Sequence, residues 1–382
     1  MHKLHYTILL IAMLVSIKNT KAQIPVNDPG WNLQPGGTSG GTEEFNSSLD
    51  FTTKWIPQYP WGDYVGGAEI EKLANLIQTT GTTLKIKADT LVPSVKRYNA
   101  TFHTGTPDSV TIVYQGGLIQ SRSVSGNEVY KFGYLEISAK YPGNNIYPLW
   151  PAFWLWSSSG CSSSPLFYNE IDICENGADE SSEGHTMGTN VHWSNVGSCN
   201  LDNDSHLSIS GLPQLSSAFH KYAIEWAPDR IIWYFDDAPV RTIYDATGAN
   251  IPQHAMAVVL NFAISQYYAY LPSDWNSALI TPHGNKLPTS FPQYFEIDYL
   301  RYYKLNTDCN TDLTLCTPST DYSSRAVKRT ITIGGSCSPT FNPTTTGGSY
   351  TLRATNYVIL DAGTTINPTG TGYFAIETMP CQ

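Results

Sequence analysis

The feature that most constrains this chain is a period-two alternation of apolar and polar residues in short segments separated by turn residues. Successive side chains of a strand point to opposite faces, so each such segment predicts a strand with one buried face. Long helical periodicity is nearly absent. The pattern therefore predicts an all-β sandwich, whose clearest strands are expected at residues 83–88, 134–140, 222–226, 231–235, 257–264 and 295–303.

The composition agrees with this fold and narrows the partners. Aromatic residues make up 12% of the chain, and the 30 glycines and 24 prolines supply turns between strands. The formal net charge of −10 disfavours a nucleic acid or an acidic membrane surface as a partner. The same charge also argues mildly against a polyanionic substrate.

Residues 1–22 are typical of an export signal, with Lys3 at the start, an apolar run from Thr7 to Ile17 and a small residue, Ala22, before the expected cleavage site. A membrane anchor is the alternative for this segment. No other segment is apolar enough to cross a membrane, so we expect a protein that is secreted, periplasmic or held at the cell surface.

The composition changes after residue 304. We expect a main domain over residues 23–304, a Thr-, Asp- and Ser-rich linker over 305–324, and a small β-rich accessory module over 325–382. An exported chain can form disulfides from its seven cysteines. Cys161 and Cys199 could pair, Cys174 is expected to be a buried free thiol, and Cys309, Cys316, Cys337 and Cys381 leave their connectivity open. No CxxC pair or histidine cluster indicates a zinc site.

Three carboxyl groups lie within six residues at Glu170, Asp172 and Glu175. Hydrolysis of a glycosidic bond usually needs two carboxyl groups with different tasks, and crowding of acids raises at least one pKa so that one group stays protonated. In a regular strand Glu170 and Asp172 share a face and Glu175 points to the other. One extra residue in a β-bulge would return Glu175 to the face of Glu170, with Ile171 and Ile173 toward the core.

The segment resembles the bulged Glu-x-Asp-x-x-Glu signature of glycoside hydrolase family 16, the laminarinase, lichenase, agarase and carrageenase group. Similar pieces spread over most of residues 40–304, at 42–46, 116–121, 131–136, 149–156, 219–226, 228–230 and 233–234. The resemblance implies a concanavalin-like β-jelly-roll sandwich with a long cleft. It also implies that Glu170 is the nucleophile, Asp172 the assisting acid and Glu175 the acid/base of a retaining mechanism.

Several other residues are candidates for contact with sugar. Trp150 and Trp154 could stack on sugar rings or pack in the core, and His192, which resembles a family position beside the catalytic strand, could bond an acid or the substrate. Asn169 and Asn261 could bind hydroxyl groups. No organic cofactor is implied, but the family often carries a structural calcium ion, and Glu44 and Asp298 are the candidate ligands.

The sequence thus favours a monomeric endo-hydrolase of a β-linked polysaccharide, with a β-1,3- or mixed-linkage β-1,3-1,4-glucan as first choice. A galactan hydrolase of the agarase, porphyranase or carrageenase type is an alternative. A transglycosylase would share the covalent intermediate and differ only in the acceptor. A non-catalytic lectin on the same sandwich would not need the three acids.

Overall fold

The structure is a computed structural model that describes residues 30–36, 40–59, 64–65, 69–71, 75–78, 83–98, 109–121, 129–143, 149–158, 168–175, 184–195, 198, 203–245, 250–264, 291–316, 326–335, 337–342, 350–370 and 374–382. The expected signal peptide, Cys161 and Cys199 lie outside these residues. The described part contains strands and no α-helix, so the all-β prediction is confirmed. It also contains no helix long and apolar enough to span a membrane.

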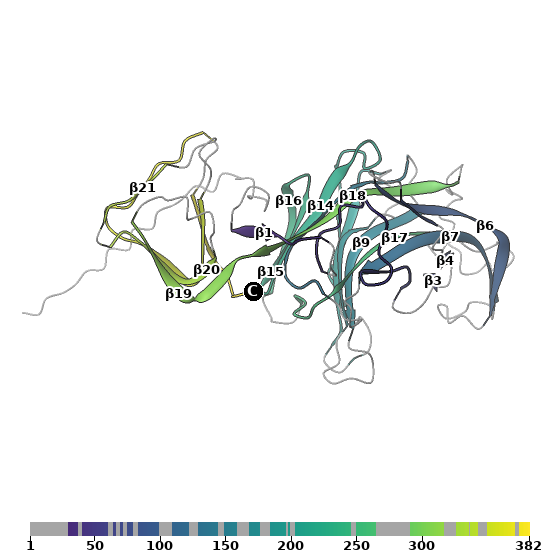
Figure 1. Ribbon diagram of the computed structural model, residues 1–382, viewed down its shortest axis with the longest axis horizontal. Helices are drawn as coiled ribbons and strands as arrows, with labels where there is room; N and C mark the ends of the chain where they lie inside the picture. The colour runs from purple at the N-terminus through teal and green to yellow at the C-terminus, as the bar shows by residue number, and fades with distance from the viewer. Residues whose placement is uncertain are drawn as a thin grey trace, which may run out of the picture.

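Two layers of strands form the larger part of the molecule (Figure 1). One layer holds β1 (Trp31–Leu33), β5 (Leu76–Gln78), β6 (Leu84–Tyr98), β8 (Gly133–Lys140), β14 (His220–Ala227), β15 (Arg230–Phe235), β16 (Ala238–Tyr244) and β18 (Gln293–Leu305). The other holds β2 (Trp55–Ile56), β7 (Ser109–Ser121), β9 (Leu149–Ser158), β10 (Tyr168–Glu175), β11 (Met187–Trp193), β12 (Asn203–Asp204), β13 (Leu207–Ile209) and β17 (Ala257–Ile264). The antiparallel pair β6–β7 joins the layers, and β3 (Tyr64–Val65) and β4 (Glu69–Glu71) extend the sheet beside it.

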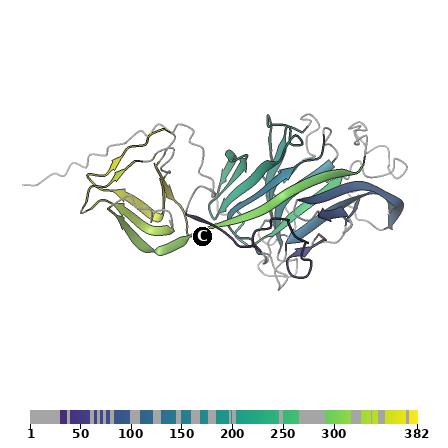
Figure 2. The ribbon, with the colours of Figure 1, turned by 45° about the horizontal axis from the view of Figure 1, so that its top comes forward.

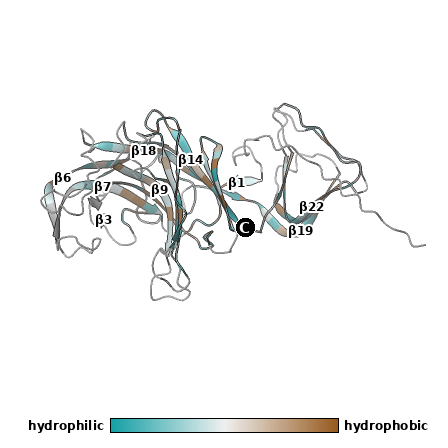
Figure 3. Ribbon diagram, turned by 180° about the vertical axis from the view of Figure 1, so that it is seen from behind, coloured by the Kyte–Doolittle hydropathy of each residue, from teal (hydrophilic) through white to brown (hydrophobic). Residues whose placement is uncertain are grey.

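Alternation along the strands builds one core between the layers, as the apolar and polar stretches along the ribbon indicate (Figure 3). On β9, Leu149, Phe153 and Leu155 are fully buried in that core, and Trp150, Ala152 and Trp154 face the other side. Asp236 and Asp237 form a two-residue hairpin loop between β15 and β16, and both residues have positive φ. That backbone conformation matches the twist of the flanking strands.

A smaller β-rich module follows the sandwich, and Figure 2 shows it at the end of the long strand β18. Its main sheet is parallel throughout and contains β19 (Thr307–Leu315), β20 (Val327–Ile333), β22 (Tyr350–Leu360) and β24 (Phe374–Thr378). A second parallel pair joins β21 (Thr340–Phe341) to β23 (Thr365–Ile366). Successive strands therefore stack as coils of a short solenoid around the apolar interior that contains Ile331, Ile333 and Leu352.

The expected linker at 305–324 is wrong over its first half, because Leu305 ends β18 and residues 307–315 form β19. The Thr- and Asp-rich composition that predicted a linker also suits a strand with a solvated face, because threonine favours strands. Asp308 and Asp312 pair with Lys328 and Arg329 of the neighbouring strand β20. Residues 317–325 lie outside the described part of the chain.

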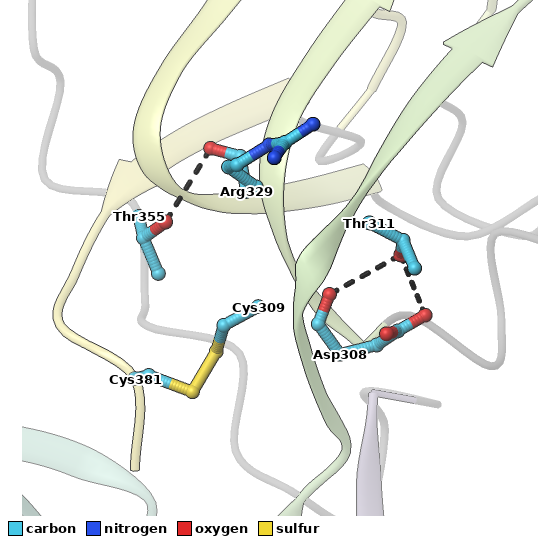
Figure 4. Close-up of a disulfide and its surroundings, with 6 residues drawn as sticks. All are labelled: Asp308, Cys309, Thr311, Arg329, Thr355 and Cys381. Atoms are coloured by element: carbon cyan, nitrogen blue, oxygen red, sulfur yellow. Dashed lines mark hydrogen bonds between the residues drawn. A yellow bond between two sulfur atoms is a disulfide. The ribbon is translucent and has the colours of Figure 1, made fainter.

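Two disulfides close the module. Cys316 is bonded to Cys337, and Cys309 on β19 is bonded to Cys381 near the end of the chain (Figure 4). The second bond ties the first strand of the solenoid to the segment that follows the last one. Cys174 is a buried free thiol in the core of the sandwich, as predicted.

The module packs directly on the sandwich. Val327 and Met379 of the module are buried with Tyr134, Tyr234 and Tyr303, which belong to the layer that contains β8, β15 and β18. Beside them an ion-pair chain crosses the boundary: Arg230 contacts both Glu225 at 2.9 Å and Glu377 at 3.9 Å, and Glu377 also pairs with Arg353 at 2.8 Å. The boundary between the two parts is therefore a buried interface.

Met379→Ala should lower the free energy of unfolding by about 2–5 kcal/mol, because it leaves a cavity where the module meets the sandwich. Chemical denaturation followed by tryptophan fluorescence measures the change. The matched control is Ile376→Ala on β24, where the side chain is 43% exposed and the loss should be much smaller. Equal losses from the two substitutions would contradict a buried interface.

Candidate active site

Strand β10 contains the predicted bulge. From Asp172 to Glu175 it advances three residues while its partner β11 advances two, from Asn190 to Gly188. Against β9, the shift falls between Asp172 and Cys174. The extra residue puts both Ile173 and Cys174 into the core and returns Glu175 to the face that carries Glu170 and Asp172.

Side chains of the opposite layer stabilise the bulge through hydrogen bonds across the core. The indole Nε1–H of Trp233, on β15, crosses the core and donates to the backbone carbonyl of Asp172 at 2.9 Å. The guanidinium of Arg241 lies 4.7 Å from the Trp233 ring and donates to the carbonyl and hydroxyl oxygens of Thr189 on β11, each at 2.8 Å. Trp233 thus ties the bulge of β10 to the opposite layer, and Arg241 ties the neighbouring strand β11 to that same layer.

Burial and neighbouring carboxyl groups raise the pKa of both glutamates. Burial is the main cause of the raised pKa of Glu170, and the charges of Asp172 and Glu175 add to it. Burial and then the charge of Asp172 raise the pKa of Glu175, and a hydrogen bond from the Trp150 indole, 3.2 Å from Oε1, partly offsets them. The buried, crowded cluster thus shifts both glutamates toward their protonated forms.

His192 lies opposite Glu170 on β11, as expected for a residue beside the three acids. Its Nε2 is 3.4 Å from Asp172 Oδ2 and 3.9 Å from Glu170 Oε1. Burial lowers the pKa of His192, but the nearby carboxylates of Asp172 and Asp204 outweigh it, so the pKa is raised overall. His192 is therefore able to bond either a carboxyl group or a ligand hydroxyl.

The expected sugar-stacking residues divide into two groups. Trp150 is partly exposed and contacts Glu175, whereas Trp154 is only 7% exposed and donates to Asn261 Oδ1 at 2.8 Å. Trp154 and Asn261 are therefore buried and bonded to each other beside the three carboxyl groups. Neither the Trp154 ring nor the Asn261 side chain is exposed for contact with sugar. The strand order brings them together because Asn261 pairs with Ala152, two residues from Trp154 on β9.

Trp156 was not among the predicted sugar-binding residues, although it pairs directly with Glu170 and is partly exposed. The alternation from Trp150 through Trp154 was the available signal, since residues two apart share a face. Asn169, expected to bind hydroxyl groups, is instead 8% exposed, and alternation places its side chain on the face of β10 opposite Glu170.

The two expected calcium ligands, Glu44 and Asp298, differ in their surroundings. Glu44 forms a two-pronged ion pair with Arg301, at 2.9 and 3.0 Å, and Asp298 is exposed on β18. Among the described residues, the group of His, Cys, Asp and Glu side chains whose donor atoms converge is formed by Glu170, Asp172 and His192. The assignment of Glu44 and Asp298 as calcium ligands stays a prediction.

Known proteins share this fold. The catalytic domain of a laminarinase from Thermotoga maritima superposes with a TM-score of 0.51 at 23% identity, over 73% of this chain and 99% of that one. The sequence is 27% identical to a kappa-carrageenase from Pseudoalteromonas carrageenovora over 299 residues, which is 73% of this chain and 66% of the relative. It is 28% identical to the endo-1,3-1,4-beta-glycanase ExsH of Rhizobium meliloti over 178 residues, 46% of this chain and 31% of the relative.

These likenesses define a jelly-roll sandwich of the glycanase class. The model of glycosyl hydrolases family 16 matches residues 70–276, more than half of the chain. The chain therefore belongs to glycosyl hydrolases family 16, and the resemblance noted in the sequence is confirmed. It spans less than two thirds of the length of ExsH and of the carrageenase.

Glu175→Gln should make the stability of the protein less dependent on pH. Because the folded-state pKa of Glu175 is raised, its favourable contribution is present below the unfolded-state pKa and is lost as the pH rises through the folded value. Between about pH 5 and about pH 8, wild type should therefore lose more free energy of unfolding than the neutral glutamine variant. Urea denaturation at several pH values measures both.

The exposed Asp298→Asn serves as the control and should follow the wild-type dependence on pH. A Glu175→Gln variant that lost stability as steeply as wild type toward high pH would contradict the raised pKa.

Proposed function

We propose that this chain is a secreted retaining endo-glycosidase that cleaves a β-linked polysaccharide by double displacement. The observation that carries the proposal is the bulge in β10, which turns Glu170 and Glu175 to one face on either side of Asp172. Family membership supports it, because the assignment of the three acids follows the family signature. The partly exposed rings of Trp150 and Trp156 on the same face supply flat surfaces for sugar.

The proposed reaction divides the work between the two glutamates. The Glu170 carboxylate attacks the anomeric carbon while Glu175, protonated, gives its proton to the departing glycosidic oxygen. Glu175 then removes a proton from water, which attacks the glycosyl–Glu170 ester and releases the sugar with its original anomeric configuration. Asp172 sits between them and raises the pKa of both. The Trp150 indole bonds the Glu175 carboxyl and fixes its direction.

The preferred substrate is a neutral β-1,3- or β-1,3-1,4-glucan. The net charge of −10 disfavours a sulfated chain, and β-1,3-1,4-glycanases of Rhizobium meliloti are among the relatives. The likeness to a kappa-carrageenase keeps a galactan as the second candidate. Export is supported by the apolar leader and by two disulfides, which form in oxidising compartments.

A panel of laminarin, lichenan, agarose, porphyran and carrageenan tests the substrate. Laminarin or lichenan should yield short oligosaccharides early, as expected for internal cleavage, and the products should be sized over time. Exclusive cleavage of a galactan would move the assignment to the second candidate. Redistribution of chain lengths without new reducing ends would indicate a transglycosylase, and binding without any change in chain length would indicate a lectin.

Substitution of the two glutamates should have different effects on substrates with different leaving groups. Glu175→Gln should slow hydrolysis of the natural glycan by about 10²–10⁴-fold but spare the first step on an aryl glycoside whose phenolate needs no protonation. Glu170→Gln should abolish turnover of both substrates. Glu296→Gln, which removes a carboxylate paired with Lys85 on the other layer, is the control and should keep wild-type kcat.

Near-normal activity of either site variant on the natural glycan would contradict the assignment, provided that its circular dichroism spectrum matches wild type.

Asp172→Asn should move both limbs of the pH–rate profile to lower pH. The working form needs Glu170 ionised and Glu175 protonated, and the charge of Asp172 raises the pKa of each. Removing that charge therefore lowers both apparent pKa values of the coupled site. Measurement of kcat/KM across the pH range decides the point, and limbs that stay in place or move upward would contradict it.

A further inference from the structure

The strongest concentration of electron-pair donors in the described chain lies where β10 faces β11. Glu170, Asp172 and His192 each offer one ligand atom, and these atoms all lie within 4.8 Å of one another. The donors come from two strands, with Glu170 and His192 directly opposite. This is why the linear spacing of the sequence shows no metal motif, although strand pairing assembles a donor set of two carboxylates and one imidazole.

Asp172 is the member of the set that most needs a partner. Its side chain is fully buried, and neither carboxylate oxygen has a hydrogen-bond partner within the described residues. Burying an ionised carboxylate without a partner costs several kcal/mol, so such groups in proteins are normally paired or bound to a metal. Oδ2 of the Asp172 carboxylate lies 3.4 Å from His192 Nε2, another member of the donor set.

The surroundings supply few donors to satisfy it. The amide oxygen of Asn190 accepts the backbone N–H groups of Val191 and Ser205, so its NH₂ group faces His192 Nε2 at 2.9 Å. Nε2 is then unprotonated in the neutral ring, and the lone pair that it offers to Asn190 is the one that a metal ion would take. The guanidinium of Arg241 is bonded to Thr189 and Ser205 instead. The site is therefore rich in acceptors, and a ligand that brings positive charge or hydroxyl donors would complete it.

We infer that Glu170, Asp172 and His192 form a binding site for a single borderline divalent cation such as Zn²⁺. Zinc takes carboxylate and imidazole ligands at about 2.0–2.2 Å and is satisfied with three protein ligands and a water molecule. Small side-chain adjustments would bring three donors from the present spacing to that distance. Calcium and magnesium fit less well, because both prefer six or more oxygen ligands and one of the three donors is a nitrogen.

The consequence for activity rests on the proposed function. A cation at this point would occupy both the attacking oxygen of Glu170 and the space of the sugar, so zinc and glycan would exclude one another. Zinc should therefore inhibit by raising the apparent KM while kcat at saturating glycan stays unchanged. The site would make the enzyme reversibly sensitive to transition metals without requiring a metal for catalysis.

Isothermal titration calorimetry of the full chain, without a histidine tag, with zinc chloride tests the site directly. Wild type should bind one Zn²⁺, and saturating zinc should raise its melting temperature, because a ligand that binds only the folded state stabilises it. His192→Gln should weaken binding by more than about tenfold. Asp172→Asn, nearly identical in shape, should do the same and serves as the second variant if the first does not fold.

His254→Gln is the matched control, since it removes an exposed imidazole outside the donor set and should leave the affinity unchanged. Magnesium and calcium chloride at the same concentration should give no comparable heat. Zinc binding that survives both His192→Gln and Asp172→Asn, or that is lost equally in His254→Gln, would overturn the proposal.

Measurement of zinc inhibition kinetics separates this inference from the proposed function. With an active enzyme, zinc inhibition that lowers kcat and leaves KM unchanged would also overturn it. If no glycan is cleaved, the proposed function fails, but the calorimetric comparison still decides whether the cation site exists.

Discussion

One extra residue in β10 is the constraint on which the rest of the site depends. Without it, strict alternation would send Glu175 to the side of Ile171, into a core that has no place for a carboxyl group. With it, Cys174 joins Ile171 and Ile173 in the core, and the opposite face gains a second glutamate. The opposite layer stabilises the irregularity, because the Trp233 indole bonds the Asp172 carbonyl that the bulge displaces.

The same geometry accounts for the electrostatics. Acids brought to one face of a packed sheet are partly removed from water and lie close together, so the pKa values of Glu170 and Glu175 rise for the same two reasons. This arrangement costs stability at high pH and keeps a proton available where a general acid is needed. It also leaves the buried Asp172 short of donors, which links the proposed chemistry to the inferred affinity for a cation.

Much of this could be predicted from the sequence where local pattern decides the outcome. The strand at Ala257–Ile264 has the expected bounds, and the bulge follows from the spacing of three acids that must share a face. What could not be predicted depends on which strands become neighbours. Alternation identifies the face that Trp154 shares, but only the pairing of β9 with β17 shows that Asn261 binds it. The parallel coils of the module likewise arise from long-range pairing, such as Arg353 with Glu377.

A crystal structure of the protein bearing a 2-fluoro glycosyl inactivator tests the central claim most directly. We expect the sugar to be joined to the Glu170 carboxylate, with the Glu175 carboxyl on the same side of the sheet and the two carboxyl groups about 5–5.5 Å apart. A sugar attached to another residue, or a Glu175 side chain directed into the core beside Ile171, would contradict the account.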